Sequence, residues 1–100
     1  MIRHIVLFKF KEDVDEERRT ILISALNGLR DKISLVKELE VGVDIGNKHN
    51  SYDIVLNSLF NTFDDVEAYA VHPEHLKVVD LVKEMCQSSV KVDFDTDSAY

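Results

Sequence analysis

The chain has few of the residues that break or cross-link a polypeptide. It contains one cysteine, one proline and three glycines in 100 residues. The single cysteine, Cys86, excludes an internal disulfide and is typical of a reducing compartment. With so few prolines and glycines, regular helices and strands should make up most of the chain. Its length suits one domain with a small core.

Three further features that the sequence lacks or has little of exclude other classes of protein. No apolar run approaches the length needed to cross a bilayer. The first residues, Met1 to His4, enter a strand-like pattern directly and lack the features of a signal peptide. Positive charge is also scarce, and the net charge of −7 repels nucleic acid. We therefore expect a cytoplasmic protein that binds neither nucleic acid nor membrane.

Hydrophobic periodicity predicts the order β-α-β-β-α-β. The expected elements are a strand over 2–10, a helix over 15–33, strands over 36–45 and 52–60, helices over 62–71 and 73–86, and a strand over 90–95. Asp15 and Thr62 are the expected N-caps. Gly28, inside the first helix, suggests close packing there.

This order of elements is that of a ferredoxin-like α+β fold. It predicts a four-stranded antiparallel sheet in which the first and third strands are central. The hydrophobic pattern agrees, because strands 2–10 and 52–60 are apolar on both sides and the other two on one side only. We assign residues 1–95 to the domain and 96–100 to a loose polar tail.

Helices cover only one face of such a sheet, so the other face would expose apolar side chains. At about 25 cal/mol per Å², burying several hundred Å² contributes roughly ten kcal/mol before the costs of association. We therefore expect a homodimer that pairs sheet against sheet around a closed apolar interior. The alternative is that the helices and tail of one subunit cover the sheet.

The segment from Tyr69 to His75, Tyr-Ala-Val-His-Pro-Glu-His, holds the candidate catalytic residues. Tyr69 and His72 are three apart and so share a helix face, whereas Pro73 forces a bend that re-aims His75. Imidazole has a pKa near neutrality, and a phenol stays a donor at pH 7. We predict that His75 takes a proton from a ligand and that Tyr69 donates a hydrogen bond to its carbonyl.

Each of these residues also has a structural interpretation. His4 lies on the same strand face as Val6 and Phe8 and can reach the same cavity, where it would orient His75 or the ligand. In the structural interpretation, it ties the sheet to a helix by a hydrogen bond. Cys86 is expected in the core. Four side chains are of types that bind metal ions, namely His4, His72, Glu74 and His75. Their spacing is not that of a metal-binding helix, so we predict no metal site.

Three segments together resemble the stress-responsive A/B barrel family, also called the dimeric α/β-barrel family. They are His4 to Lys11, Gly42-Val43-Asp44, and Tyr69 to His75. The resemblance implies a dimeric barrel that needs no cofactor. In a plant polyketide cyclase of that family, the positions of Tyr69 and His75 act in an aldol ring closure.

The resemblance also implies a ligand cavity. We expect it to be lined by His4, Val6, Phe8, Ile23, Leu26, Leu56, His72 and Val78. Ile23 and Leu26 replace aromatic residues of the cyclase, so the cavity should differ in shape. In some relatives, backbone carbonyls after the first helix hold a cation; whether those near Arg30, Ile33 and Val36 do so stays open.

Three functions are compatible with these residues. The first is a binding or stress-protection module whose barrel holds a small apolar or aromatic ligand. The second is a cofactor-independent polyketide cyclase or lyase-like enzyme that uses His75 and Tyr69. The third is a cofactor-free monooxygenase.

Overall fold

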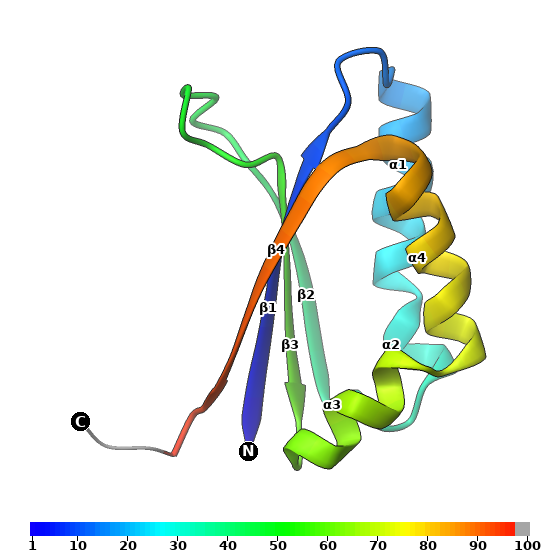
Figure 1. Ribbon diagram of the computed structural model, residues 1–100, viewed down its shortest axis with the longest axis vertical. Coiled ribbons are helices and arrows are strands. Elements are labelled where there is room, and N and C mark those ends of the chain that lie inside the picture. Colours follow the sequence, from blue (N-terminus) through cyan, green and yellow to red (C-terminus); the bar gives the residue numbers. More distant parts are fainter. Residues whose placement is uncertain (98–100) are drawn as a thin grey trace.

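The protein consists of two layers, a twisted four-stranded sheet and a set of helices packed on one of its faces (Figure 1). The computed structural model describes residues 1–97. Its elements are β1 (Ile2–Phe10), α1 (Glu16–Asn27), α2 (Leu29–Lys32), β2 (Glu38–Val43), β3 (Ile54–Phe60), α3 (Phe63–Ala70), α4 (Pro73–Met85) and β4 (Cys86–Asp95). No helix in the described part of the chain has the length and hydropathy to span a membrane.

The sheet has the strand order β2-β3-β1-β4 with every pair antiparallel, so the predicted ferredoxin-like fold is confirmed. The predicted caps are also confirmed. The Asp15 side chain accepts a hydrogen bond from the Arg18 amide, and the Thr62 side chain accepts one from the Asp65 amide. Each cap satisfies an amide that has no partner within its helix.

Several predicted elements differ from the structure. The strands predicted over 36–45 and 52–60 are shorter, Glu38–Val43 and Ile54–Phe60. The first helix is interrupted at Gly28, where α1 ends and α2 begins. A Cβ at this position would lie 3.6 Å from the carbonyl oxygens of Ser24 and Ala25, which is an ordinary contact. The prediction of close packing at Gly28 is therefore wrong. The last strand begins at Cys86 instead of residue 90, because Cys86 already pairs with Phe10 of β1.

The two faces of the sheet have different surroundings. The face toward the helices carries buried Phe8, Leu56 and Phe60, which belong to the core together with Leu22 and Leu26 of α1. The apolar positions of β4 lie on the other face, because they pair with the outward residues of β1. This open face carries Ile5, Leu7, Val55, Val90, Val92 and Phe94.

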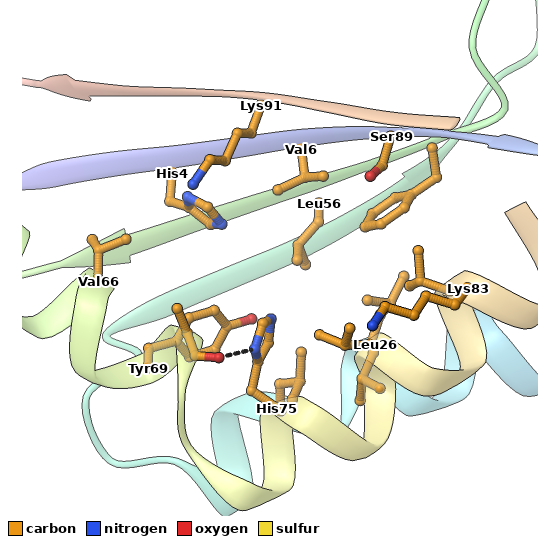
Figure 2. Close-up of a pocket in the computed structure, with 16 residues that line it drawn as sticks. His4, Val6, Leu26, Leu56, Val66, Tyr69, His75, Lys83, Ser89 and Lys91 are labelled. Carbon is orange, nitrogen blue, oxygen red and sulfur yellow. Dashed lines mark hydrogen bonds between the residues drawn. The ribbon is translucent and has the colours of Figure 1, made fainter. Parts of the chain in front are cut away.

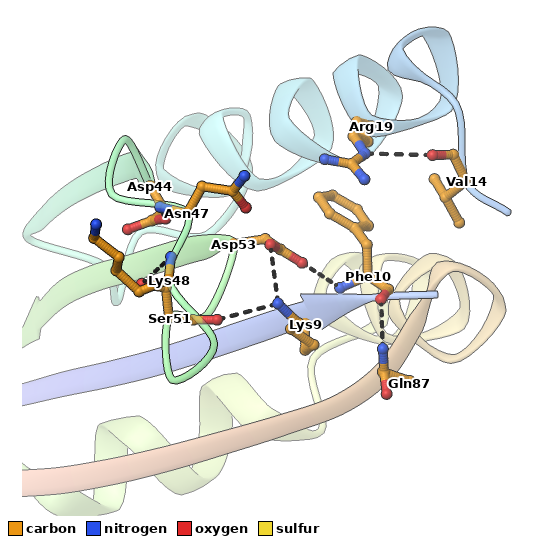
Figure 3. Close-up of polar contacts among 10 residues, drawn as sticks. All are labelled: Lys9, Phe10, Val14, Arg19, Asp44, Asn47, Lys48, Ser51, Asp53 and Gln87. Carbon is orange, nitrogen blue, oxygen red and sulfur yellow. Dashed lines mark hydrogen bonds and ion pairs between the residues drawn. The ribbon is translucent and has the colours of Figure 1, made fainter. Parts of the chain in front are cut away.

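Polar contacts fix the end of β1 (Figure 3). The Asp53 carboxylate accepts a hydrogen bond of 2.8 Å from the Phe10 amide and lies 3.5 Å from Lys9 Nζ. The Gln87 side chain donates to the Phe10 carbonyl oxygen over 2.9 Å. These contacts connect β1 to both of its neighbours and so hold the register that places His4 on the helix-covered face.

The beginning of the predicted loose tail is bonded to the chain's first residue. The Thr96 amide donates to the Met1 carbonyl oxygen over 3.0 Å, and the Asp97 carboxylate lies 2.8 Å from the Met1 ammonium. The rest of that predicted tail, 98–100, lies outside the described residues.

Candidate active site

A cavity of about 280 Å³ lies between the helix-covered face of the sheet and the helices (Figure 2). This volume is near the lower end for small-molecule sites. Most of its wall is apolar. The lining residues are His4, Val6, Phe8, Leu26, Leu29, Leu56, Val66, Tyr69, Ala70, His75, Val78, Val79, Val82, Lys83, Ser89 and Lys91.

The bend between α3 and α4 brings Tyr69 and His75 together. Helix α3 ends at Ala70, and Pro73 occupies the first turn of α4, as its fixed backbone angle and missing amide hydrogen favour. The rings of Tyr69 and His75 are consequently 4.3 Å apart, centroid to centroid. Both side chains line the same cavity.

His72 has a different place from the one expected. It is the N-cap of α4, and its Nδ1 accepts a hydrogen bond of 3.1 Å from the Glu74 amide. It lies beyond the end of α3, so it does not share a helix face with Tyr69, and it does not line the cavity.

The His75 imidazole has one nitrogen hydrogen-bonded, while the other makes no hydrogen bond to any residue within 1–97. Nδ1 lies 3.0 Å from the Ala70 carbonyl oxygen. Since a carbonyl oxygen only accepts, Nδ1 carries the hydrogen and Nε2 keeps its lone pair in the neutral ring. Burial lowers the pKa of His75, the bond to Ala70 raises it, and the nearby imidazoles of His4 and His72 lower it further; the net direction is downward. The neutral form, which can act as a base, is therefore favoured at pH 7.

The hydroxyl of Tyr69 is buried without a partner. The residue is 1% exposed, and its oxygen makes no hydrogen bond to any other described residue. Burial raises the pKa of Tyr69 well above the ordinary value for a phenol, so the group is a donor at all physiological pH values. An unpaired buried hydroxyl costs about 1–3 kcal/mol, and a ligand oxygen in the cavity would satisfy it.

His4 lies beside these two residues, held by an acidic residue from the neighbouring strand. Its Nδ1 is bonded to the Asp93 carboxylate in β4, and its ring meets the Tyr69 ring edge-on at 6.1 Å. Sequence reasoning missed Asp93. The alternation of apolar Val92 and Phe94 around it does place it on the opposite face, but only the register of β4 against β1 brings it to His4.

Most of the residues predicted to bind a ligand lie at the wall of this cavity. His4, Val6, Phe8, Leu26, Leu56 and Val78 line the cavity, whereas Ile23 does not. Ile23 lies on the α1 face toward the end of β1, at a separate hollow that it shares with Phe10 and Arg19. The structure therefore places Ile23 at that hollow and not at the cavity that holds His75.

The location of the cavity also corrects an expectation. We expected a chamber closed by the sheets of two subunits, but the cavity is formed by the sheet and helices of one chain. The apolar face that would pair with a second subunit is the opposite one.

Within residues 1–97, no group of three or more His, Cys, Asp or Glu side chains comes together to hold a metal.

The chain is thus a ferredoxin-like α+β domain with a cavity at which Tyr69 and His75 lie side by side. A model of the "Stress responsive A/B Barrel Domain" matches residues 2–96, so the chain belongs to that family. It is 34% identical over 101 residues to a stress-response A/B barrel domain-containing protein of Arabidopsis thaliana, covering 97% of this chain. It spans only 37% of the length of that protein, and 49% of the length of a second Arabidopsis protein with such a domain.

Two further relatives bear on the site and the assembly. Olivetolic acid cyclase of Cannabis sativa is 21% identical over 95 residues, which cover 93% of this chain and 94% of the cyclase. A dimeric protein of unknown function with a ferredoxin-like fold, from Bacteroides fragilis, is 35% identical in its crystal structure. The two structures superpose with a TM-score of 0.79 over 94% of each chain.

Proposed function

We propose that this chain binds a small apolar or aromatic molecule that places a carbonyl or hydroxyl oxygen against Tyr69. The observation that carries the proposal is the buried Tyr69 hydroxyl without a partner, at the wall of an otherwise apolar cavity. Buried polar groups in folded proteins are nearly always hydrogen-bonded, so such a group points to a missing oxygen acceptor. The surrounding hydrocarbon side chains supply the rest of the binding free energy.

A matched pair of probes tests this proposal. 4-Phenyl-2-butanone has a carbonyl oxygen, and butylbenzene has nearly the same shape without it. We expect the ketone to bind the wild type more tightly in NMR titrations that map to the cavity, and the Tyr69→Phe variant to lose that preference. Tyr52→Phe, which does not line the cavity, is the control. Equal affinity of both probes for the wild type would contradict the proposal.

A second candidate function is enzymatic, and the free Nε2 of His75 favours it. In this mechanism, Nε2 takes a proton from the carbon next to the ligand's carbonyl, and Tyr69 stabilises the resulting enolate oxygen with a hydrogen bond. The enolate carbon can then attack a second carbonyl, and protonated His75 returns its proton to the alkoxide. This aldol chemistry is compatible with the name of the cyclase relative and needs no cofactor. The cofactor-free monooxygenase stays a prediction that no described residue of the cavity favours.

Proton abstraction can be measured before the natural substrate is known. We expect the wild type to exchange the protons next to the carbonyl of 4-phenyl-2-butanone for deuterium in D₂O, as followed by NMR. His75→Ala should reduce this exchange to the rate of buffer alone. If the wild type also exchanges at the buffer rate, the enzymatic candidate is wrong, while the binding function is still tested by the titration above.

We also propose that the chain forms a homodimer through the open face of its sheet. Val92 is 55% exposed and pairs with Ile5 of β1, and Phe94, on the same face of β4 opposite Arg3, is 45% exposed. Such a contiguous apolar face is rare on a monomer. The dimeric relative from Bacteroides fragilis is compatible with this assembly. Sedimentation velocity at micromolar concentration should show the mass of two chains.

A further inference from the structure

The two histidines at the cavity have the same ring nitrogen bonded, but to partners of different charge. Nδ1 of His4 is bonded to the Asp93 carboxylate, whereas Nδ1 of His75 lies 3.0 Å from the neutral carbonyl oxygen of Ala70. Both rings line the cavity and lie beside the ring of Tyr69, at centroid distances of 6.1 Å for His4 and 4.3 Å for His75. The two imidazoles of one cavity thus differ in the charge of the group behind them.

His4 is held from both neighbouring strands. It extends from β1 on the sheet side of the cavity, while His75 extends from α4 on the helix side (Figure 2). The Ser58 hydroxyl of β3 donates a hydrogen bond of 3.2 Å to the His4 carbonyl oxygen, and Asp93 is the register partner of His4 in β4. The side chains of His4 and Asp93 are mostly buried, where a hydrogen bond to a charged group is stronger than one between neutral groups.

Only one of the two imidazoles has a counter-charge for a proton. The other titratable or charged groups at or next to the cavity are Tyr69, His72, Lys83 and Lys91. None of these is an anion at pH 7, and no aspartate or glutamate within residues 1–97 lines the cavity. The Glu74 carboxylate, next to His75 in sequence, is paired with Lys77 instead. Because two positive charges repel each other across a mostly apolar space, the proton is retained at His4, where a carboxylate compensates it.

We propose that Asp93 is a positioning residue that keeps a proton on His4 and so leaves His75 as the base of the cavity. This inference rests on the enzymatic candidate and assigns opposite roles to its two imidazoles. Protonated His4 carries a hydrogen on Nε2 as well, and this N–H donates to the ligand oxygen on which negative charge develops. Neutral His75 takes the carbon-bound proton, and the electron pair of that C–H bond moves toward the same oxygen. Environments that separate two titratable groups in this way are typical of acid and base pairs in enzymes.

NMR of the imidazole nitrogens in the ligand-free protein tests where the proton lies. At pH 7, we expect hydrogens on both nitrogens of His4 and on Nδ1 alone of His75. The wild-type spectrum tests this placement by itself, so the result does not depend on the stability of a variant. A His4 ring that is neutral at pH 7 would overturn the inference.

Asp93→Asn keeps the size of the side chain and removes its charge. We expect His4 to become neutral at pH 7 in this variant, and the titration midpoint of His75 to rise by about half a pH unit, because the positive charge beside it is gone. The direct effect of losing a carboxylate has the opposite sign, since it would lower the midpoint of a nearby imidazole. A His75 midpoint that falls or stays the same in Asp93→Asn would therefore show the inference to be wrong.

Asp80→Asn is the matched control, since it removes an equal charge from an exposed residue of α4 that does not line the cavity. It should move the His75 midpoint by less than about 0.2 pH units, as expected for a screened charge. In the deuterium exchange of 4-phenyl-2-butanone, Asp93→Asn should lower the wild-type rate by about tenfold or more, and Asp80→Asn should leave it unchanged. Equal exchange rates in the wild type and Asp93→Asn would exclude the proposed role of Asp93. A wild type that does not exchange the ketone would overturn the enzymatic candidate alone, because the placement of the proton is measured without a ligand.

Discussion

The imidazole of His4 in β1 is bonded to the carboxylate of Asp93 in β4, its register partner in the neighbouring strand. Both side chains are mostly buried, with 9% and 14% exposed. Because the bond holds Nδ1, the other ring nitrogen is directed away from Asp93. The pair thus positions His4 beside Tyr69 and His75 and joins the edge strand to the cavity.

A double-mutant cycle with His4→Ala and Asp93→Ala should measure this pair. We expect a coupling free energy of about 1–2 kcal/mol in urea unfolding, because a largely buried hydrogen bond to a charged group is lost. A parallel cycle on the exposed pair of Glu74 and Lys77 is the control and should give a much smaller coupling. Equal couplings for the two pairs would show that Asp93 does not hold His4.

Tyr69→Phe should separate stability from binding. In the ligand-free protein, this change removes a buried hydroxyl without a partner and leaves the packing of the ring in place. We therefore expect the free energy of unfolding to rise by about 1 kcal/mol, as measured by urea denaturation. The same variant should bind the ketone probe less tightly. A variant that is less stable than the wild type would indicate that the hydroxyl has a partner in solution.

The lowered pKa of His75 predicts a pH dependence of stability. A histidine whose pKa is depressed by folding binds its proton more readily in the unfolded chain, where the ordinary value is 6.5. The stability that its neutral form contributes is therefore complete above pH 6.5 and is lost as the pH falls through the depressed folded value.

NMR titration of the imidazole and urea unfolding at a series of pH values both measure this effect. We expect His75 to titrate at a lower pH in the native protein than in 8 M urea. His75→Gln should weaken the loss of stability below pH 6.5. A native titration at or above the value in urea would contradict the assignment of burial as the main cause.

The fold was predictable because each level of the sequence agrees with the others. The period of the apolar residues set the element types, Asp15 and Thr62 marked helix starts, and Pro73 marked the bend that unites Tyr69 with His75. The two-sided apolarity of residues 2–10 correctly predicted a central strand. Local consistency of this kind is what specifies one structure.

What sequence reasoning missed depends on three-dimensional register. Asp93, Lys91 and Ser89 became part of the site because β4 pairs along the whole of β1, beginning at Cys86. Their polar character suggested only solvent exposure. Ile23 was misplaced for a similar reason, since helical spacing does not fix which part of the sheet a helix residue faces. Nothing in the periodicity distinguishes a residue at a cavity from one at a neighbouring hollow.

The proposed dimer leads to a prediction that separates assembly from binding. Val92→Asp places a charge on the open face, opposite Ile5 of β1, where a paired sheet would have to bury it. We expect the variant to sediment as a single chain at micromolar concentration while its far-UV circular dichroism stays native. Ile45→Asp, at a fully exposed loop residue, is the control and should remain dimeric.

Because the cavity is formed within one chain, the single-chain variant should bind 4-phenyl-2-butanone within about threefold of the wild type, a change under 1 kcal/mol. A wild type that sediments as a folded single chain would exclude the dimer, and a Val92→Asp chain that loses the probe would show that the cavity depends on the partner subunit.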